Sequence, residues 1–134
     1  MSNFVNTVDS IGDEALTNSI IYRSITKILD NYATRIGRSA FEYCSELITA
    51  DFQAVTRIDS YAFSECSKLT ALILRSETMA TLSSTSAFNS TPIKSGTGYI
   101  YVPAALVDSY KAANNWSTYA NQIRAIEDYP EICG

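Results

Sequence analysis

Histidine is absent from this chain of 134 residues. Its absence excludes catalytic pairs in which an imidazole activates a serine or a cysteine, and it excludes zinc sites of the HExxH type. Only three cysteines are present, so a four-cysteine zinc site is excluded as well. The best candidate for a phosphate-binding loop, residues 95–98, lacks the lysine and the helix start that such a loop needs. We therefore expect neither a metal nor a cofactor.

The sequence also lacks long apolar runs and an excess of positive charge. Its longest apolar stretches, such as residues 72–74, are the length of a strand and fall short of the roughly 18–20 residues that cross a bilayer. The formal charge is −4, whereas a nucleic-acid partner favours a basic surface. Residues 1–9 show neither the basic region nor the apolar region of a secretory signal peptide. We expect a folded domain without membrane insertion and without a nucleic-acid partner.

What the sequence does contain is an internal repeat. Residues 36–47 return as residues 58–69 at a constant offset of 22, with Ile, Ala-Phe, Cys and Leu at matching places. A fixed period in the twenties with apolar residues in register is typical of a leucine-rich-repeat solenoid. An L-x-x-L-x-L frame at residues 47–52 and 69–74 predicts one short strand per repeat. The fold class we expect is therefore α/β: a short solenoid with a parallel β-sheet face.

The opposite side of each coil is predicted from the Ala-Phe pairs. These pairs begin a tight helical or 3₁₀ turn whose Phe fills the core, so Phe41 and Phe63 are expected to be buried and stacked. Cys44 and Cys66 share one repeat position, and we expect a pair of buried, reduced thiols in preference to a disulfide. Cys133 is expected to lie in a frayed end.

The same offset extends towards the N-terminus. Residues 24–29 fall on the strand position one repeat earlier. Asp30 stands there at a core position, so this coil is expected to be looser or to begin its turn one residue earlier. Residues 11–16 echo residues 36–41 at an offset of 25, which indicates a degenerate copy that caps the solenoid.

Towards the C-terminus the repeat becomes irregular and then ends. Residues 87–88 follow residues 62–63 by 25, which predicts a three-residue insertion around residues 77–86, and residues 98–102 supply a final strand. After Pro103 the apolar residues take helical spacing, as expected of a cap that covers the last coil. We therefore predict one domain over residues 1–134, comprising an N-terminal cap (1–23), repeats (24–102), a helical cap (103–128) and a tail (129–134).

The repeat resembles the BspA-type leucine-rich repeat, whose pattern I-G-x-x-A-F-x-x-C-x-x-L stands here at residues 36–47. In the second copy Asp59 replaces the glycine. Residues 98–111, followed by residues 115–117, are similar to the C-terminal ending of many such proteins from gut bacteria and their prophages. The resemblance implies an adhesion protein at the bacterial cell surface or outside the cell, or alternatively a phage tail or receptor-binding component of the virion.

The strand positions that point away from the core form the candidate binding surface for a protein or glycan partner. Exposed aliphatic residues in a row, namely Leu29, Ile48 and Ile73, favour an interface, although an ordinary solvated sheet surface is the alternative. The partner-binding residues that we predict are Thr49, Asp51, Gln53, Ala71, Ile73, Arg75, Tyr99 and Tyr101.

The charged residues give no sign of catalysis. Acidic pairs such as Glu42 and Glu46 have no partner base, and we expect a protein that is not an enzyme. Arg35 and Arg57 share one repeat position, so we expect them to stack. Either an acidic side chain such as Glu77 or a ligand anion pairs with them, or the two arginines spread apart in solvent.

Overall fold

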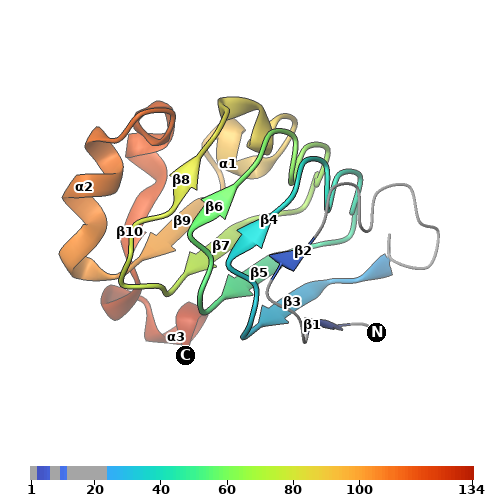
Figure 1. Cartoon of the computed structure of the whole chain (residues 1–134), viewed down its shortest axis with the longest axis horizontal. Helices are drawn as coiled ribbons and strands as arrows, with labels where there is room; N and C mark the ends of the chain where they lie inside the picture. The colour runs from blue at the N-terminus through green and yellow to red at the C-terminus, as the bar shows by residue number, and fades with distance from the viewer. Residues whose placement is uncertain (1–2, 7–9, 12–23) are drawn as a thin grey trace.

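The chain winds into stacked coils, and equivalent strands of successive coils pair in parallel (Figure 1). This computed structural model describes residues 3–6, 10–11 and 24–134. A six-stranded sheet has the order β1-β3-β5-β7-β9-β10, and a sheet of four two-residue strands has the order β2-β4-β6-β8. The α/β solenoid predicted from the repeat is therefore confirmed. The strands are β1 (Asn3–Asn6), β2 (Ser10–Ile11), β3 (Lys27–Asp30), β4 (Arg35–Ile36), β5 (Thr49–Phe52), β6 (Arg57–Ile58), β7 (Ala71–Leu74), β8 (Thr81–Leu82), β9 (Tyr99–Val102) and β10 (Ile123–Ala125).

The strand register reproduces the offset read from the sequence. Lys27 lies opposite Thr49, which in turn lies opposite Ala71. Ile11 lies opposite Ile36, as the echo in the N-terminal copy predicts. Residues 12–23, which would complete that copy, lie outside the residues that the structure describes.

Asp30 occupies its core position without shortening the coil. Strand β3 runs through Asp30, which lies opposite Phe52 at the same point of β5. Its side chain is buried, and Oδ2 accepts a hydrogen bond from the Ala33 backbone N–H at 3.0 Å. The expectation of an earlier turn is therefore wrong, because the carboxylate itself closes the turn after the strand.

The coil that leads from β7 to β9 is longer than the regular repeat, and its extra residues lie at two places. Arg57 lies opposite Thr81, two residues beyond the regular offset, which places part of the predicted insertion before β8. Ala71 lies opposite Tyr99, six residues beyond that offset, so the coil gains further residues around α1 (Pro92–Ser95). The second insertion was not predicted. It adds the short helix α1 in place of a turn and leaves the next strand, β9, intact, so the strand pattern in the sequence does not reveal it.

The third side of each coil is a turn that bonds to the next coil. The backbone N–H groups of Ser39, Phe41 and Tyr43 donate to carbonyls one coil further on, at 2.8–3.0 Å. We expected a tight helical or 3₁₀ turn here. The segment is a series of tight turns with i→i−3 hydrogen bonds, but the positive φ angles of Ser39 and Tyr43, 58° and 68°, prevent it from being a regular helix. Among the copies of this turn within residues 24–134, the later one alone forms a 3₁₀ helix, η2 (Thr85–Phe88).

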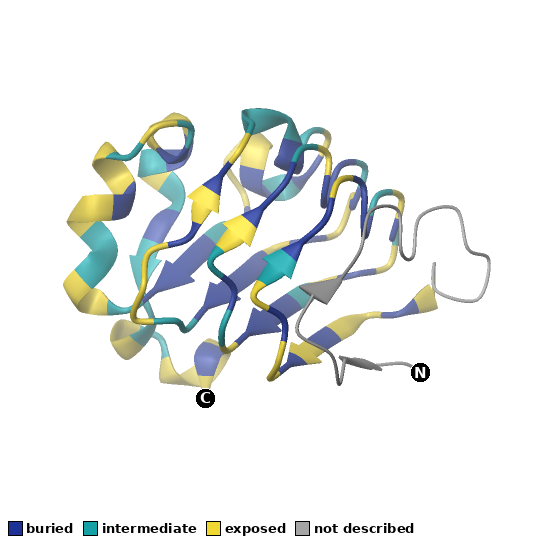
Figure 2. Ribbon diagram, in the orientation of Figure 1, coloured by how far each residue is buried: buried dark blue, intermediate teal, exposed yellow. Residues whose placement is uncertain are grey.

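A column of phenylalanine rings fills the core between these sides. Phe41 and Phe63 stack with centroids 5.5 Å apart, and Phe63 stacks on Phe88 at 6.0 Å. All three rings are fully buried, which confirms the prediction for the first two. Figure 2 shows that the middle strands of the large sheet, β5, β7 and β9, are mostly buried as well. The coil interior is thus a continuous apolar stack with one ring per repeat.

The two thiols at the shared repeat position are also in this core. Cys44 and Cys66 are fully buried and are not joined by a disulfide, as predicted. Cys66 Sγ donates to the Phe41 carbonyl oxygen at 3.1 Å. Burial raises the pKa of Cys66 well above its ordinary value, so this thiol stays protonated at neutral pH.

Short helices cover the last coil at the end of the solenoid away from the N-terminus (Figure 1). Trp116 and Tyr110 are buried; the Trp116 indole N–H donates to the Ala80 carbonyl at 2.8 Å, and the Ala80 N–H donates to the Tyr110 hydroxyl at 2.7 Å. The Tyr119 hydroxyl donates to the Thr85 carbonyl at 2.6 Å. These side chains therefore satisfy backbone groups that the last coil leaves unpaired. The helices are η3 (Ala104–Leu106), α2 (Val107–Ala112), η4 (Trp116–Gln122), η5 (Ile126–Asp128) and α3 (Pro130–Cys133).

The segment expected to be a wholly helical cap also contains a strand. Within it, β10 pairs in parallel with β9, and Ile123 lies opposite the core residue Ile100. The large sheet therefore continues one strand beyond the recognisable repeats.

Candidate binding face of the large sheet

Two columns of side chains run across the outer face of the large sheet, one position per strand. The parallel register sets these columns, because residues that lie opposite each other on successive strands project to the same side. They consist of Lys27, Thr49, Ala71 and Tyr99 in the first column, and of Leu29, Asp51, Ile73, Tyr101 and Arg124 in the second.

The C-terminal segment covers the middle of this face. Cys133 of α3 is buried together with Ala71, Ile73 and Tyr101, and Ile126 and Tyr129 pack against the same cluster. Ile73 has no exposed surface, and Tyr101 is only 3% exposed. We predicted that residues 129–134 form a tail and that Cys133 is frayed. Both predictions are wrong, because this segment packs on the sheet and buries an apolar cluster there.

Asp51 and Arg75 anchor that segment. Arg75 Nε and Nη2 donate to the two oxygens of Asp51 at 2.8 and 2.9 Å, and Nη2 also donates to the Cys133 carbonyl oxygen. The hydrogen bonds to Asp51 raise the pKa of Arg75 above its ordinary value. A bidentate pair of this kind fixes the guanidinium, so the last turn of the chain is held at a defined point.

The structure places the eight predicted partner-binding residues in two groups. We expected all of them to face solvent, and for Ala71, Ile73 and Tyr101 this is wrong, because the C-terminal segment lies over them. Asp51 is buried against Arg75. The residues that keep accessible surface are Thr49, Gln53, Arg75 and Tyr99.

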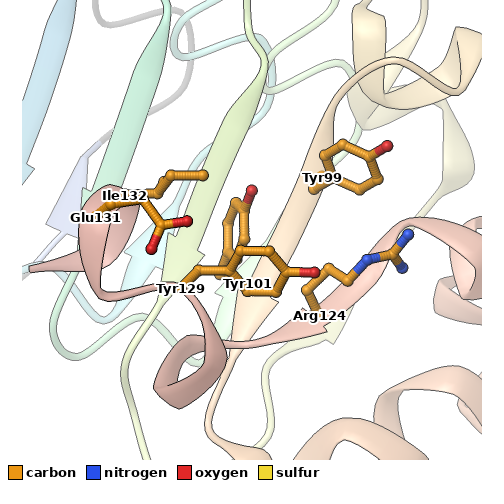
Figure 3. A pocket seen from close by; sticks show the side chains of 6 residues that line it. All are labelled: Tyr99, Tyr101, Arg124, Tyr129, Glu131 and Ile132. Carbon is orange, nitrogen blue, oxygen red and sulfur yellow. The ribbon is translucent and has the colours of Figure 1, made fainter.

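A cleft opens where the C-terminal segment meets strands β9 and β10. Its volume is about 260 Å³, and Figure 3 shows Glu131 and Ile132 on one side, Tyr99 and Arg124 on the other, and the rings of Tyr101 and Tyr129 between them. Tyr101 and Tyr129 meet edge to face with centroids 5.3 Å apart. The Arg124 guanidinium lies over the Tyr99 ring, 4.7 Å from its centroid.

A second hollow continues from this cleft towards the N-terminal strands. It has a volume of about 470 Å³ and shares Tyr99, Tyr101, Glu131 and Ile132 with the first. Thr49, Thr70, Ala71 and Thr97 complete its lining. The two hollows together form an extended depression on the sheet face, and four of the predicted residues line it, namely Thr49, Ala71, Tyr99 and Tyr101.

Four residues that line the first cleft escaped the sequence interpretation, namely Arg124, Tyr129, Glu131 and Ile132. A weak signal for the covering segment was present, because Ile126, Tyr129 and Cys133 recur at helical spacing. No comparable signal marks Arg124, since β10 does not repeat the L-x-x-L-x-L frame.

On the small sheet, the stacked arginines have an acidic partner. Asp59 accepts from Arg57 Nε at 2.7 Å and pairs with Arg35 Nη2 at 2.8 Å. Arg35 lies opposite Arg57, so one carboxylate pairs with both arginines of the stack. The partner is therefore Asp59 and not the suggested Glu77, and the replacement of glycine by Asp in the second repeat supplies it.

From the contacts of Arg75 with Asp51 and Cys133 we predict how the C-terminal segment responds to substitution. In Arg75→Leu, alkylation of Cys133 should accelerate roughly 10- to 100-fold, because hydrogen bonds to a charged group each contribute about 1.5–3 kcal/mol. Cys44 and Cys66 should stay protected, since they lie in the solenoid core. Peptide-resolved mass spectrometry after timed iodoacetamide treatment measures the three rates separately.

The matched control is Lys68→Leu, which removes the exposed pair that Lys68 forms with Glu46. It should leave all three alkylation rates unchanged. An unchanged Cys133 rate in Arg75→Leu would show that Arg75 does not hold the segment. Equal acceleration at all three cysteines would indicate global unfolding and contradict a local anchor.

Stacked coils whose equivalent strands pair in parallel define a repeat solenoid. The sequence matches the profile of the BspA type leucine rich repeat region in six copies that span residues 2–104. The chain therefore belongs to the BspA-type leucine-rich-repeat family, a class of repeat-based binding modules. No curated protein matches the chain in a sequence search. Among the described residues, no helix combines the length and the apolar character needed to cross a membrane.

Proposed function

We propose that the protein is a non-enzymatic adhesion module that holds a partner protein on the open part of the outer sheet face. We define this open face by Lys27, Leu29, Ile48, Thr49 and Gln53, which precede the region that the C-terminal segment covers. Membership of a family of binding repeats supports a binding role, and repeat solenoids use extended faces for this purpose.

The observation that carries the proposal is the exposure of two aliphatic side chains on this face. Leu29 and Ile48 are 38% and 45% exposed, although the neighbouring Ile73 is completely covered. Aliphatic groups beside polar Thr49 and Gln53 on a rigid sheet match the mixed composition of protein–protein interfaces. Leu29 lies in the paired strand β3, and Ile48 directly precedes β5 and donates its backbone N–H to the Thr26 carbonyl at 2.9 Å, so both side chains are presented without a large ordering cost on binding.

The test is a binding array of purified cell-surface and extracellular-matrix proteins, probed with the full chain on beads. We expect saturable binding to at least one array member and a loss of at least about 10-fold in Leu29→Asp/Ile48→Asp, because a buried charge opposes desolvation of the interface. Met79→Asp is the matched control, since Met79 is also exposed but lies near the C-terminal cap. Absence of any binding, or equal loss in the control, would overturn the proposal.

A second candidate is a virion component that attaches a phage to its host. The resemblance of residues 98–111 and 115–117 to the ending of proteins from gut bacteria and their prophages is compatible with it. The open face would then contact a neighbouring virion protein or a host receptor. Flanking tail genes would support this candidate, whereas a flanking secretion or sortase locus would support adhesion at the cell surface.

A further inference from the structure

We propose that the cleft between the C-terminal segment and strands β9 and β10 binds a neutral pyranose sugar. The sugar ring would lie against the tyrosine rings, and its hydroxyl groups would be held by Glu131 and Arg124 (Figure 3). The inference adds a ligand class to the proposed adhesive function, and its biological role rests on that proposed function. The cleft shares no residue with the open face, so the two proposals can fail independently.

Size and shape favour a ligand of this kind. The cleft of about 260 Å³ lies just below the usual range of small-ligand pockets, about 300–1,000 Å³, and suits a single ring. The adjoining hollow of about 470 Å³ leaves room for a second ring of a longer glycan. The edge of the large sheet beside the cleft is already occupied by β10, so a peptide could not add to β9 as a strand.

The polar groups of the cleft have unused hydrogen-bonding capacity. Within the described part of the chain, no hydrogen bond engages the hydroxyls of Tyr99, Tyr101 and Tyr129, and Glu131 has no ion-pair partner. A carboxylate accepts two hydrogen bonds, and a phenol both donates and accepts. A row of sugar hydroxyls can satisfy all of these groups at once, whereas an aliphatic ligand would leave them unpaired.

The charges of the cleft favour a neutral ligand. Arg124 Nη1 donates to the carbonyls of Asn121 and Ile123 at 2.8 and 3.1 Å, which fixes the guanidinium beside Tyr99 and leaves its other N–H groups available. Glu131 places one negative charge on the opposite side of the opening. One charge of each sign attracts neither phosphate nor an acidic sugar, because either anion would face the carboxylate.

The aromatic rings supply the surface on which a sugar ring would pack. An aromatic face carries partial negative charge, and the axial C–H groups of a pyranose present a weakly positive face. Tyr99 and Tyr129 are half-buried, so their rings are held by the fold while part of each ring faces the opening. Aromatic packing together with a few placed polar groups is the composition expected of a small-ligand site.

The experiment is saturation-transfer NMR and calorimetry on the full chain with the methyl glycosides of glucose, galactose, mannose and N-acetylglucosamine. We expect saturable binding of at least one of them with Kd on the order of 1 mM. Glu131→Gln and Tyr99→Ala should each weaken it at least about 5-fold, since one such interaction contributes about 1 kcal/mol or more. Tyr43→Ala, at an exposed tyrosine in a repeat turn, should leave Kd unchanged.

Further probes separate a sugar site from a general polyol site and from an anion site. Sorbitol, which has the hydroxyls without the ring, and inorganic phosphate should both bind more weakly than the best glycoside. Thermal melts of the variants confirm that they are folded, and Tyr99→Phe retains the ring if Tyr99→Ala is unstable. The proposal is overturned if no glycoside binds at about ten times the expected Kd, if phosphate binds more tightly, or if binding survives in both cleft variants.

Failure of this experiment differs from failure of the proposed function. The array binding depends on Leu29 and Ile48, which do not line the cleft. A chain that binds a protein but no glycoside would lose the sugar site alone. A chain that binds a glycoside but no array protein would keep the sugar site and lose the protein-binding face.

Discussion

Phe63→Ala should lower the free energy of unfolding by about 3–5 kcal/mol, as expected for removal of a fully buried aromatic ring that leaves a cavity. Phe63 is the middle ring of the core column: it stacks on Phe41 and Phe88, and Phe52 lies 6.1 Å away. Two coil-to-coil contacts are therefore lost together. Urea denaturation measures the change, and the melting temperature should fall by roughly 10–20 °C.

Two further variants show whether the ring stack is responsible. Phe63→Leu keeps most of the apolar volume and should lose distinctly less stability than Phe63→Ala. Tyr32→Ala removes an aromatic ring of which about half is exposed, and it should change stability by no more than about 0.5 kcal/mol. A loss below about 1 kcal/mol in Phe63→Ala would contradict a continuous core at this ring.

Removal of residues 103–134 should leave a chain that is unfolded or aggregated. The deletion uncovers Phe88 and Val102, and it takes away the buried rings of Tyr110, Trp116 and Tyr119. Each large buried side chain contributes about 1.5–3 kcal/mol, so the loss is comparable to the whole stability of a domain, about 5–15 kcal/mol. Gel filtration and circular dichroism over a thermal scan measure the outcome.

A shorter deletion is the matched control for the cap. Removal of residues 130–134 takes away α3 and uncovers Ile73, but it leaves the aromatic cap and β10 in place. This variant should remain folded with a lower melting temperature. If the chain of residues 1–102 stays monomeric and melts within a few degrees of the full chain, the C-terminal helices do not stabilise the solenoid.

The core of the solenoid could be predicted because its signal is local and repeated. Each copy carries the same apolar residues at the same spacing, so a constant offset of 22 places Phe41 on Phe63 and Cys44 on Cys66. Parallel stacking of coils turns that one-dimensional period directly into neighbouring positions in space. The strand positions, the ring column and the family follow from the same period.

The outer face could not be predicted in the same way, because what covers it lies outside the period. Arg75 bonds to Cys133, 58 residues further along the chain, and no spacing rule links the two. Strand alternation does place Ile73 and Tyr101 outward, but whether an outward residue meets solvent depends on the path of the C-terminal segment. The prediction of a fully open face failed for that reason.

The ion pairs also depend partly on the sequence repeat and partly on the folded structure. The repeat places Arg57 beside Arg35, since both occupy one position of the period. The acidic side chain that pairs with both depends on rotamers and on a departure from the repeat pattern at Asp59. Asp51 and Arg75 likewise come together because strands β5 and β7 are neighbours.

By itself the sequence determined the coil, its period and its aromatic core, because periodic burial of apolar side chains admits one stacking arrangement. Only the tertiary structure decided which part of the sheet face remains open and where the cleft forms. That outcome depends on a non-repeating segment whose few apolar side chains and one guanidinium contact bind it across strands distant in sequence. Such contacts arise from the folded geometry of the sheet, and the period of the chain does not encode them.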